Sequence, residues 1–372
     1  MTMCIFAASK RKKNIQKMKR ILKIALYGVL GLVVVAGVLI GMEFAPLVKG
    51  AMSCEKLDDG LYYMEYQGDD GFEELMKRGG CENADQFASY AMEFLSKGHY
   101  KPEAKTSKET YGCSALTVST PDGGVLMGRN FDYPSATAII LHTIPTRGYE
   151  TITTFNVEFY GFGDGFKPEG FKNQYMCLSG LFFALDGINE KGLAIADLMA
   201  GDSIETHQRT NKPDLTTTAA ISYMLKNAAN VGEALQLLSG IDMHSDIGSA
   251  HHYAMADASG RSVVVEYVDN KMVVTESPAL ANHYLCEAKH NVGLIEGDDR
   301  YDRLCNQYDK TGGVMNEQQL TEAIKSVSQT QREGFLGTAW TTVMDLKRPS
   351  VTYYSRRHFN KPFHFELSRT NP

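Results

Sequence analysis

The pattern of apolar and polar positions changes twice along the chain. Residues 24–42 form a run of 19 without a charged side chain. As a helix this run would span roughly 28 Å, about the thickness of a bilayer core. Residues 55–112 are polar with apolar positions at helical spacing, which predicts mostly helices. Beyond them, short apolar and β-branched runs between turn sequences predict mainly strands.

These later elements predict a mixed fold, because strands come in runs with helices between the runs. The sequence Pro-Asp-Gly-Gly at 121–124 indicates a hairpin joining strands at 114–120 and 125–131. Further strands are predicted at 138–145, 151–157, 181–185, 193–198, 252–256, 262–268 and 271–275, with a hairpin over 338–354. Helices are predicted over 216–238 and 317–327. The order favours an α+β fold with antiparallel sheets over alternating βαβ units.

The charge distribution favours a membrane anchor at the beginning of the chain. Residues 1–23 contain eight Lys or Arg and no acid, whereas the remainder has a net charge of −14. Positive charge before an apolar span stays in the cytoplasm, which would place everything after Glu43 outside. A cleaved signal peptide is the alternative, although its apolar stretch usually runs about 7–15 residues. The acidic remainder repels phosphate, so no nucleic acid partner is expected.

The four predicted regions are a basic cytoplasmic head (1–23), a transmembrane helix (24–42), a helical pro-segment (43–112) and a catalytic domain (113–372). The seven cysteines include no Cys-x-x-Cys pair and show no metal-ligand spacing, so neither a metal nor another cofactor is expected. An odd number of cysteines in an exported chain leaves one thiol unpaired, which is a candidate nucleophile.

One predicted hairpin brings reactive side chains together. Cys113 opens its first strand, and an Arg-Asn-Phe-Asp cluster closes the second. Arg129 would favour the thiolate by its charge, and Asp132 would hold an ammonium or amine beside the thiol. Taken alone, the same residues also fit a small buried thiol and a surface salt bridge.

Residues 111–133 resemble the start of the mature chain in the choloylglycine hydrolase family, the linear amide C–N hydrolases. In that family a cysteine is followed after sixteen residues by arginine in a Gly-Arg-Asn motif, and three residues later by aspartate. Cys113, Arg129 and Asp132 keep these intervals. The resemblance implies the four-layer αββα sandwich of N-terminal-nucleophile hydrolases, with Cys113 as the nucleophile.

The resemblance continues in pieces over residues 113–365. The segment 186–198 (DGINEKGLAIADL) resembles a family strand that ends at an oxyanion-hole N–H, which falls on Met199. The segment 277–284 (SPALANHY) resembles the one that supplies the side-chain oxyanion donor, which falls on Asn282. Its wording is closer to the acyltransferase-like branch than to the bile salt hydrolases.

A last segment, 297–303 (GDDRYDR), resembles the family's final active-site arginine motif. It assigns this role to Arg300, with Arg303 as the fallback. Because an N-terminal nucleophile needs a free amine, the resemblance implies autocatalytic cleavage between Gly112 and Cys113. The resemblance to relatives of the acid ceramidase type allows the upstream fragment to stay bound as a helical subunit, and the sequence does not determine whether it does.

The glycine-rich sequence FYGFGDGF has two interpretations. Phe159, Tyr160 and Phe162 either line an apolar acyl pocket or fold the loop on itself. A separate pair, His251-His252, fits strand and turn positions better than a metal site.

The sequence thus predicts a hydrolase that cleaves an N-acyl amide outside the cytoplasmic membrane. Two alternatives share the fold: an acyltransferase that uses the same thioester, and a non-catalytic membrane-anchored protein that is never cut. The amide stays open among conjugated bile salts, penicillin V, acyl homoserine lactones and N-acyl amino acids. The sequence does not determine the oligomeric state.

Overall fold

A computed structural model describes residues 18, 23, 26, 27, 38, 41–99, 112–160, 166–201, 203–246, 249–289, 292–293 and 297–368. The chain divides into two units, Met1–Val48 and Lys49–Pro372. The described residues of the first unit are helical. No helix within the described ranges is long and apolar enough to cross a bilayer. A transmembrane helix is predicted over 24–42. Most of that range, and of the basic head, lies outside the described residues.

The hairpin that contains Cys113 lies within a six-stranded sheet. Its order is β14-β3-β4-β15-β16-β17, and all neighbours are antiparallel. The strands are β3 (Gly112–Ser119), β4 (Val125–Tyr133), β14 (Ala279–Leu280), β15 (Gly337–Asp345), β16 (Ser350–Ser355) and β17 (Phe363–Glu366). Both predicted hairpins are confirmed, and each joins neighbouring strands of this sheet.

A nine-stranded sheet has the order β1-β2-β5-β6-β7-β8-β11-β12-β13. Its strands are β1 (Glu55–Asp58), β2 (Leu61–Gly68), β5 (Ala138–Pro145), β6 (Thr151–Asn156), β7 (Asp186–Asn189), β8 (Ala194–Met199), β11 (His251–Ala256), β12 (Ser262–Val268) and β13 (Lys271–Glu276). The strand predicted at 181–185 is wrong, because Cys177–Phe182 is a 3-10 helix and the strand begins only at Asp186.

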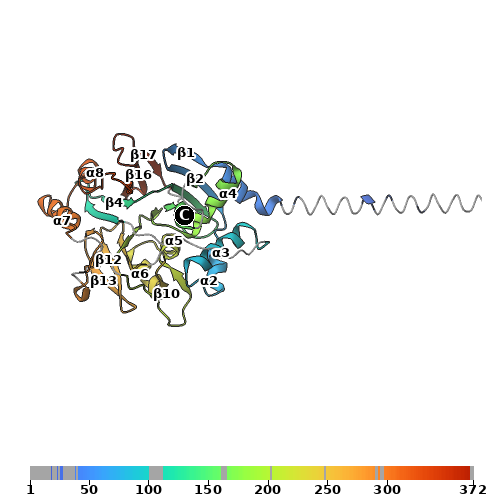
Figure 1. Ribbon diagram of the computed structural model, residues 1–372, viewed down its shortest axis with the longest axis horizontal. Coiled ribbons are helices and arrows are strands. Elements are labelled where there is room, and N and C mark those ends of the chain that lie inside the picture. The colour runs from blue at the N-terminus through green and yellow to red at the C-terminus, as the bar shows by residue number, and fades with distance from the viewer. Residues whose placement is uncertain are drawn as a thin grey trace, which may run out of the picture. The chain divides into compact units, whose positions relative to one another are not determined.

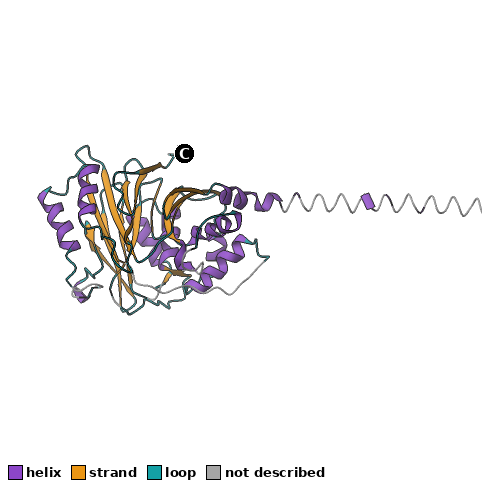
Figure 2. Ribbon diagram, turned by 45° about the horizontal axis from the view of Figure 1, so that its top comes forward, coloured by secondary structure: helices purple, strands orange, loops and turns teal. Residues whose placement is uncertain are grey.

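Helices cover the outer faces of the two sheets (Figure 2). α7 (Arg300–Lys310) and α8 (Glu317–Ser326) pack on the six-stranded sheet, and α5 (Thr217–Asn227) packs on β6, β7 and β8. α6 (Val231–Ser239) follows α5, so the single helix predicted over 216–238 is two helices. A short parallel pair, β9 (Asp214–Thr216) and β10 (Asp242–His244), lies beside α5 (Figure 1).

Strand alternation explains how the layers meet. On β4, Gly128 faces α8, where an added Cβ would lie 2.5 Å from Ile324 Cγ1. The next side chain, Arg129, points the other way and pairs with Asp186 of the nine-stranded sheet. Successive strand residues face opposite sides, so the order of layers is helix, sheet, sheet, helix. The predicted α+β fold is confirmed.

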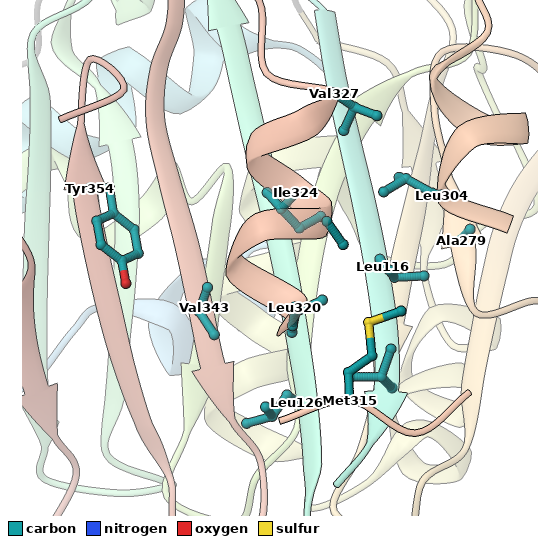
Figure 3. Close-up of a cluster of buried hydrophobic side chains, with 12 residues drawn as sticks. Leu116, Leu126, Ala279, Leu304, Met315, Leu320, Ile324, Val327, Val343 and Tyr354 are labelled. Atoms are coloured by element: carbon teal, nitrogen blue, oxygen red, sulfur yellow. The ribbon is translucent and has the colours of Figure 1, made fainter. Parts of the chain in front are cut away.

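A buried apolar cluster fixes α8 on the six-stranded sheet (Figure 3). Leu320 and Ile324, one helical turn apart, pack towards Leu116 of β3 and Val343 of β15. The helix begins with a capping box, in which Asn316 and Gln319 satisfy each other's backbone N–H groups.

The segment predicted to be a helical pro-segment is only partly helical. α2 (Phe72–Lys77) and α3 (Ala84–Leu95) confirm helices there, but β1 and β2 are strands. β2 pairs in parallel with β5 over eight residues. Its buried Tyr62, Met64 and Tyr66 recur every second residue, which is strand periodicity. This part of the chain therefore completes the large sheet. The connector predicted at 101–110 lies outside the described residues.

Candidate active site

The predicted hairpin does bring a thiol and a guanidinium into contact. Cys113 pairs with Phe131 across the β3–β4 ladder, and Ala115 pairs with Arg129. Cys113 and Arg129 are therefore diagonal neighbours on one face, within reach of a long side chain. Arg129 Nη2 donates a hydrogen bond to Cys113 Sγ at 3.3 Å. Both residues are completely buried.

Arg129 is held by partners from the facing sheet. Its Nη1 donates to Asp186 Oδ2 at 2.7 Å, and its Nη2 donates to the Asp197 carbonyl at 3.1 Å. Trp340 Nε1–H also donates to Asp186 Oδ2 at 2.9 Å, and its ring lies beside the guanidinium. The sequence did not predict Asp186 or Trp340, although Asp186 begins the 186–198 segment on which the resemblance partly rests.

The Arg129–Asp186 pair gives a prediction for stability. Replacing Asp186 with alanine is expected to lower the free energy of unfolding by about 3–5 kcal/mol, because Arg129 would keep a buried, uncompensated charge. The matched control is Glu276→Ala, whose pair with Arg261 is largely exposed. That control is expected to cost less than about 1 kcal/mol. Urea unfolding measures both, and equal losses would contradict the assignment.

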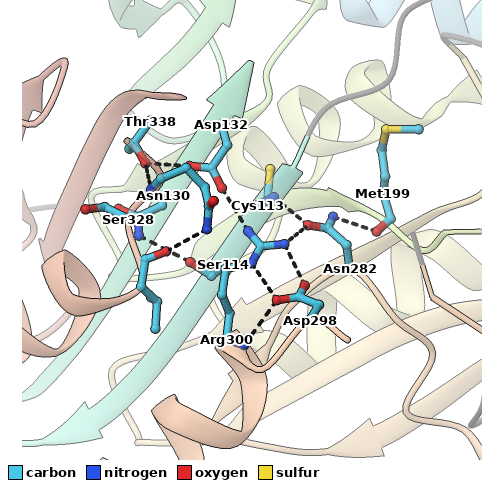
Figure 4. A network of polar contacts seen from close by, with 12 residues as sticks. Cys113, Ser114, Asn130, Asp132, Met199, Asn282, Asp298, Arg300, Ser328 and Thr338 are labelled. Atoms are coloured by element: carbon cyan, nitrogen blue, oxygen red, sulfur yellow. Dashed lines mark hydrogen bonds and ion pairs between the residues drawn. The ribbon is translucent and has the colours of Figure 1, made fainter. Parts of the chain in front are cut away.

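A second buried arginine holds the carboxylate of the hairpin (Figure 4). Arg300, the first residue of α7, donates from Nη1 to Asp132 Oδ2 at 2.8 Å. Asp298 orients Arg300 by accepting hydrogen bonds from Nε and Nη2 at 2.9 and 2.7 Å. Thr338 donates its hydroxyl to Asp132 Oδ1 at 2.5 Å. The sequence did not predict Asp298 or Thr338.

Arg303, the fallback for Arg300, lies elsewhere. Its side chain is 44% exposed and pairs with Asp299 one turn earlier on the helix. The structure therefore places Arg300, and not Arg303, beside Asp132.

Asn282 joins the remaining predicted residues. Its Oδ1 accepts hydrogen bonds from the Cys113 N–H at 2.6 Å and from Arg300 Nη2 at 2.8 Å, and its Nδ2 donates to the Met199 carbonyl at 2.8 Å. These partners fix the orientation of the amide. In an extended strand the N–H and C=O of one residue point to the same side. The Met199 N–H therefore lies on the edge of β8 that faces Asn282 (Figure 4).

Burial dominates the electrostatics of the site. It raises the pKa of the Cys113 thiol to about 12, and the Arg129 guanidinium opposes this shift only in part. It also raises the pKa of Asp132, which Arg300 and Thr338 oppose. Burial alone would lower the pKa of Arg300, but the carboxylates of Asp298 and Asp132 raise it. The Cys113 thiol is thus buried and protonated at neutral pH.

The aromatic residues predicted near the site are described only in part. Phe159 is completely buried, with its ring centroid 4.9 Å from that of Tyr133 and 6.1 Å from that of Phe131. It belongs to the packed core behind β4, and its contact with a substrate stays a prediction. The side chain of Tyr160 and all of Phe162 lie outside the described residues. In the described ranges, no three His, Cys, Asp or Glu side chains are grouped to hold a metal ion.

Two facing sheets between helices, with a cysteine at the start of a central strand, define an α+β fold of the N-terminal-nucleophile-hydrolase type. Residues 113–294 match the family described as linear amide C–N hydrolases, choloylglycine hydrolase family. The resemblance seen in the sequence is therefore confirmed, because the family model matches the part of the chain that begins at Cys113.

Three known proteins are similar to parts of the chain. A penicillin V acylase from Pectobacterium atrosepticum is 32% identical over 109 residues, which cover 26% of this chain and 29% of that protein. The chain thus matches less than a third of the length of this relative. A variant of conjugated bile acid hydrolase from Clostridium perfringens has a TM-score of 0.50 and 17% identity, covering 70% of this chain and 94% of that one. Penicillin V acylase from Agrobacterium tumefaciens has a TM-score of 0.49 and 19% identity, covering 69% and 87%.

Proposed function

We propose that this protein hydrolyses linear N-acyl amides through Cys113, after cleavage of its own Gly112–Cys113 bond. The observation that carries the proposal is that separate groups contact the thiol and the backbone nitrogen of one residue. Arg129 contacts Sγ, whereas Asn282 accepts from the nitrogen that cleavage would convert into an amine. Nucleophile and base would then belong to a single residue.

Cleavage begins with attack of the Cys113 thiol on the Gly112 carbonyl carbon. A carbon–sulfur bond forms, the Gly112–Cys113 peptide bond breaks, and the thiol proton passes to the departing nitrogen. Water then hydrolyses the thioester, which releases a carboxylate on Gly112 and restores the thiol. Gly112 pairs with Asp132 across the ladder, so the new amine forms close to the Asp132–Arg300 pair.

In turnover, the free amine serves as the base. An α-amino group has a pKa of about 7.7–8.0, so part of it is unprotonated at neutral pH. It takes the thiol proton as sulfur attacks the substrate carbonyl, and then returns the proton to the leaving nitrogen. The Met199 N–H and Asn282 stabilise the oxyanion, and losing one such donor typically costs on the order of 10²–10³ in rate. Water finally releases the acyl group from sulfur.

An acyltransferase is the second candidate, because the same thioester can pass its acyl group to an amine. The likeness of the 277–284 segment to the acyltransferase-like branch favours this alternative. Comparing products with and without an amine acceptor separates the two activities: a transferase forms a new amide, and a hydrolase forms the free acid. The predicted location outside the cytoplasm stays a proposal.

The experiment that tests the proposal combines terminal sequencing with a substrate panel. Purified protein is expected to show Cys113 as a mature N-terminus. The cut protein is expected to hydrolyse at least one of four classes, namely conjugated bile salts, penicillin V, acyl homoserine lactones and N-acyl amino acids. An intact chain that is fully active, or a cut chain that hydrolyses no class, would refute the proposal.

A further inference from the structure

Two adjacent histidines on β11 take no part in the proposed chain cleavage or amide hydrolysis. Successive strand residues point to opposite faces of a sheet, so His251 and His252 lie on different sides of the nine-stranded sheet. Both are buried, and each meets a buried carboxylate on a neighbouring strand. Burying a histidine beside a carboxylate is costly unless both are well bonded, so the bonds of each pair are informative.

The hydrogen-bond geometry of His251 requires a cationic imidazole ring. Its Nδ1 lies 3.0 Å from Asp197 Oδ2, and its Nε2 lies 2.8 Å from the Asp246 carbonyl oxygen. Both partners accept hydrogen bonds, so both ring nitrogens must carry a proton. Burial by itself would lower the pKa of His251, but the charges of Asp197 and Asp246 raise it to about 9. Asp246 also accepts from Thr218 at the start of α5.

The His251–Asp197 pair lies at the end of β8. His251 is the residue opposite Met199 in the β8–β11 ladder, and Asp197 precedes Met199 by two residues in β8. The carbonyl of Asp197 accepts the hydrogen bond from Arg129 Nη2 that also orients the arginine toward sulfur. A displacement of this strand end would therefore move the Met199 N–H and the anchor of Arg129 together.

His252 meets a different carboxylate, on the face that looks towards the other sheet. Its Nδ1 lies 3.4 Å from Glu266 Oε1 on β12. The two oxygens of Glu266 accept the backbone N–H groups of Leu285 and Cys286 at 2.7 and 2.8 Å. Burial alone would raise the pKa of Glu266. The hydrogen bonds from His252 and from the two backbone N–H groups outweigh burial, so the pKa of Glu266 is lowered.

Glu266 thereby anchors the segment that carries Asn282. This segment leaves β14, which is paired with β3 in the six-stranded sheet, and reaches the nine-stranded sheet at Glu266. Asn282 lies between these two attachment points, where it contacts both Cys113 and Met199. Without the carboxylate, two buried N–H groups would lose their acceptor, at roughly 1–3 kcal/mol each.

We propose that His251 and His252 are positioning residues for the two oxyanion donors, and the proposal rests on the amidase function above. His251 holds the Met199 strand end through Asp197. His252 holds the Asn282 segment through Glu266. Neither histidine touches the thiol, so each acts on catalysis only by keeping a donor in place.

The test compares His251→Gln and His252→Gln in the cut enzyme with a matched control, His142→Gln. His142 also pairs with a carboxylate, that of Glu150 at 2.6 Å, but it lies on β5, three strands away from β8. Misplacing a donor by about 1 Å costs on the order of 10²-fold in rate. We expect kcat to fall about 10- to 100-fold in the first two variants, with KM changed less than about threefold. The control is expected to retain kcat within about twofold.

The pH dependence of the wild-type enzyme tests the role of His251 even if the variants fail to fold. Because His251 loses a proton as pH rises through about 9, one of its two acceptors would lose its donor. The kcat of the wild-type enzyme is therefore expected to fall reversibly across this range. The cationic form is required, so the fall occurs on the alkaline side and not on the acid side. A flat kcat between pH 8 and about 10 would overturn the role of His251.

The outcomes separate this inference from the proposed function. If wild-type protein stays uncut, or Cys113→Ala keeps its turnover, the amidase function itself fails. If Cys113→Ala is inactive while His251→Gln and His252→Gln retain wild-type kcat, only the positioning proposal fails. It also fails if His142→Gln loses as much kcat as the other two variants.

Discussion

Replacement of Cys113 by alanine is expected to abolish chain cleavage and amide hydrolysis together. One sulfur atom performs both reactions, first on the Gly112 carbonyl and then on the substrate. Removing a nucleophile that works together with its own base typically costs about 10⁶-fold in kcat, so turnover should fall below detection. Intact mass would show one uncut chain, and an amide hydrolysis assay would show no product.

The control for this experiment is Cys305→Ala. Cys305 is a free thiol on α7, the helix that begins with Arg300, but it packs in the cluster under α8. This variant is expected to be cut and to turn over like the wild type. A Cys113→Ala protein that is still cut at the Gly112 bond, or that still hydrolyses the substrate, would remove the basis of the proposed function.

The second large effect concerns the fragment upstream of the cut. Fragments ending at Gly112 and beginning at Cys113 are expected to co-elute on size exclusion and to separate only in denaturant. β2 is an internal strand of the large sheet, paired with β5 throughout its length. Its departure would expose Leu61, Met64 and Tyr66, each worth roughly 1.5–3 kcal/mol of burial. It would also leave the edge of β5 unpaired.

Two ion pairs between the fragment and the catalytic part provide a matched comparison. Asp70 pairs with Lys226 in a mostly buried setting, whereas Asp59 pairs with Arg356 at the surface. Asp70→Ala should promote dissociation of the fragments at a lower urea concentration, because Lys226 would stay buried without its partner. Asp59→Ala should have little effect. Free exchange of the fragment in native buffer would contradict the prediction.

The segment upstream of Cys113 differs from its sequence prediction in secondary structure. The sequence predicts a helical pro-segment over residues 43–112, yet β1 and β2 extend the nine-stranded sheet. The average polarity of β2 is high because Tyr63, Glu65 and Gln67 alternate with its buried residues. A polar average predicts exposed helix, whereas the period-two placement of Tyr62, Met64 and Tyr66 is typical of a strand.

The candidate site divides in the same way into local and distant parts. The four-residue turn at 121–124 sets the register of β3 on β4, so the contact between Cys113 and Arg129 follows from nearby sequence alone. The groups that hold Arg129 do not, since Asp186 is 57 residues away. Nothing local shows which of the 44 acidic side chains will meet a buried guanidinium.

By itself, the sequence determined the strand-rich character of residues 113–372, the hairpin, and the resemblance to a family whose spacing Cys113, Arg129 and Asp132 keep. Such features depend on turn residues and side-chain periodicity, which act over a few positions. Only the tertiary structure decided that Asp186 holds the buried Arg129, and that β2 pairs with β5. These arrangements arise when two sheets pack face to face, because burial then selects partners that are remote in the chain.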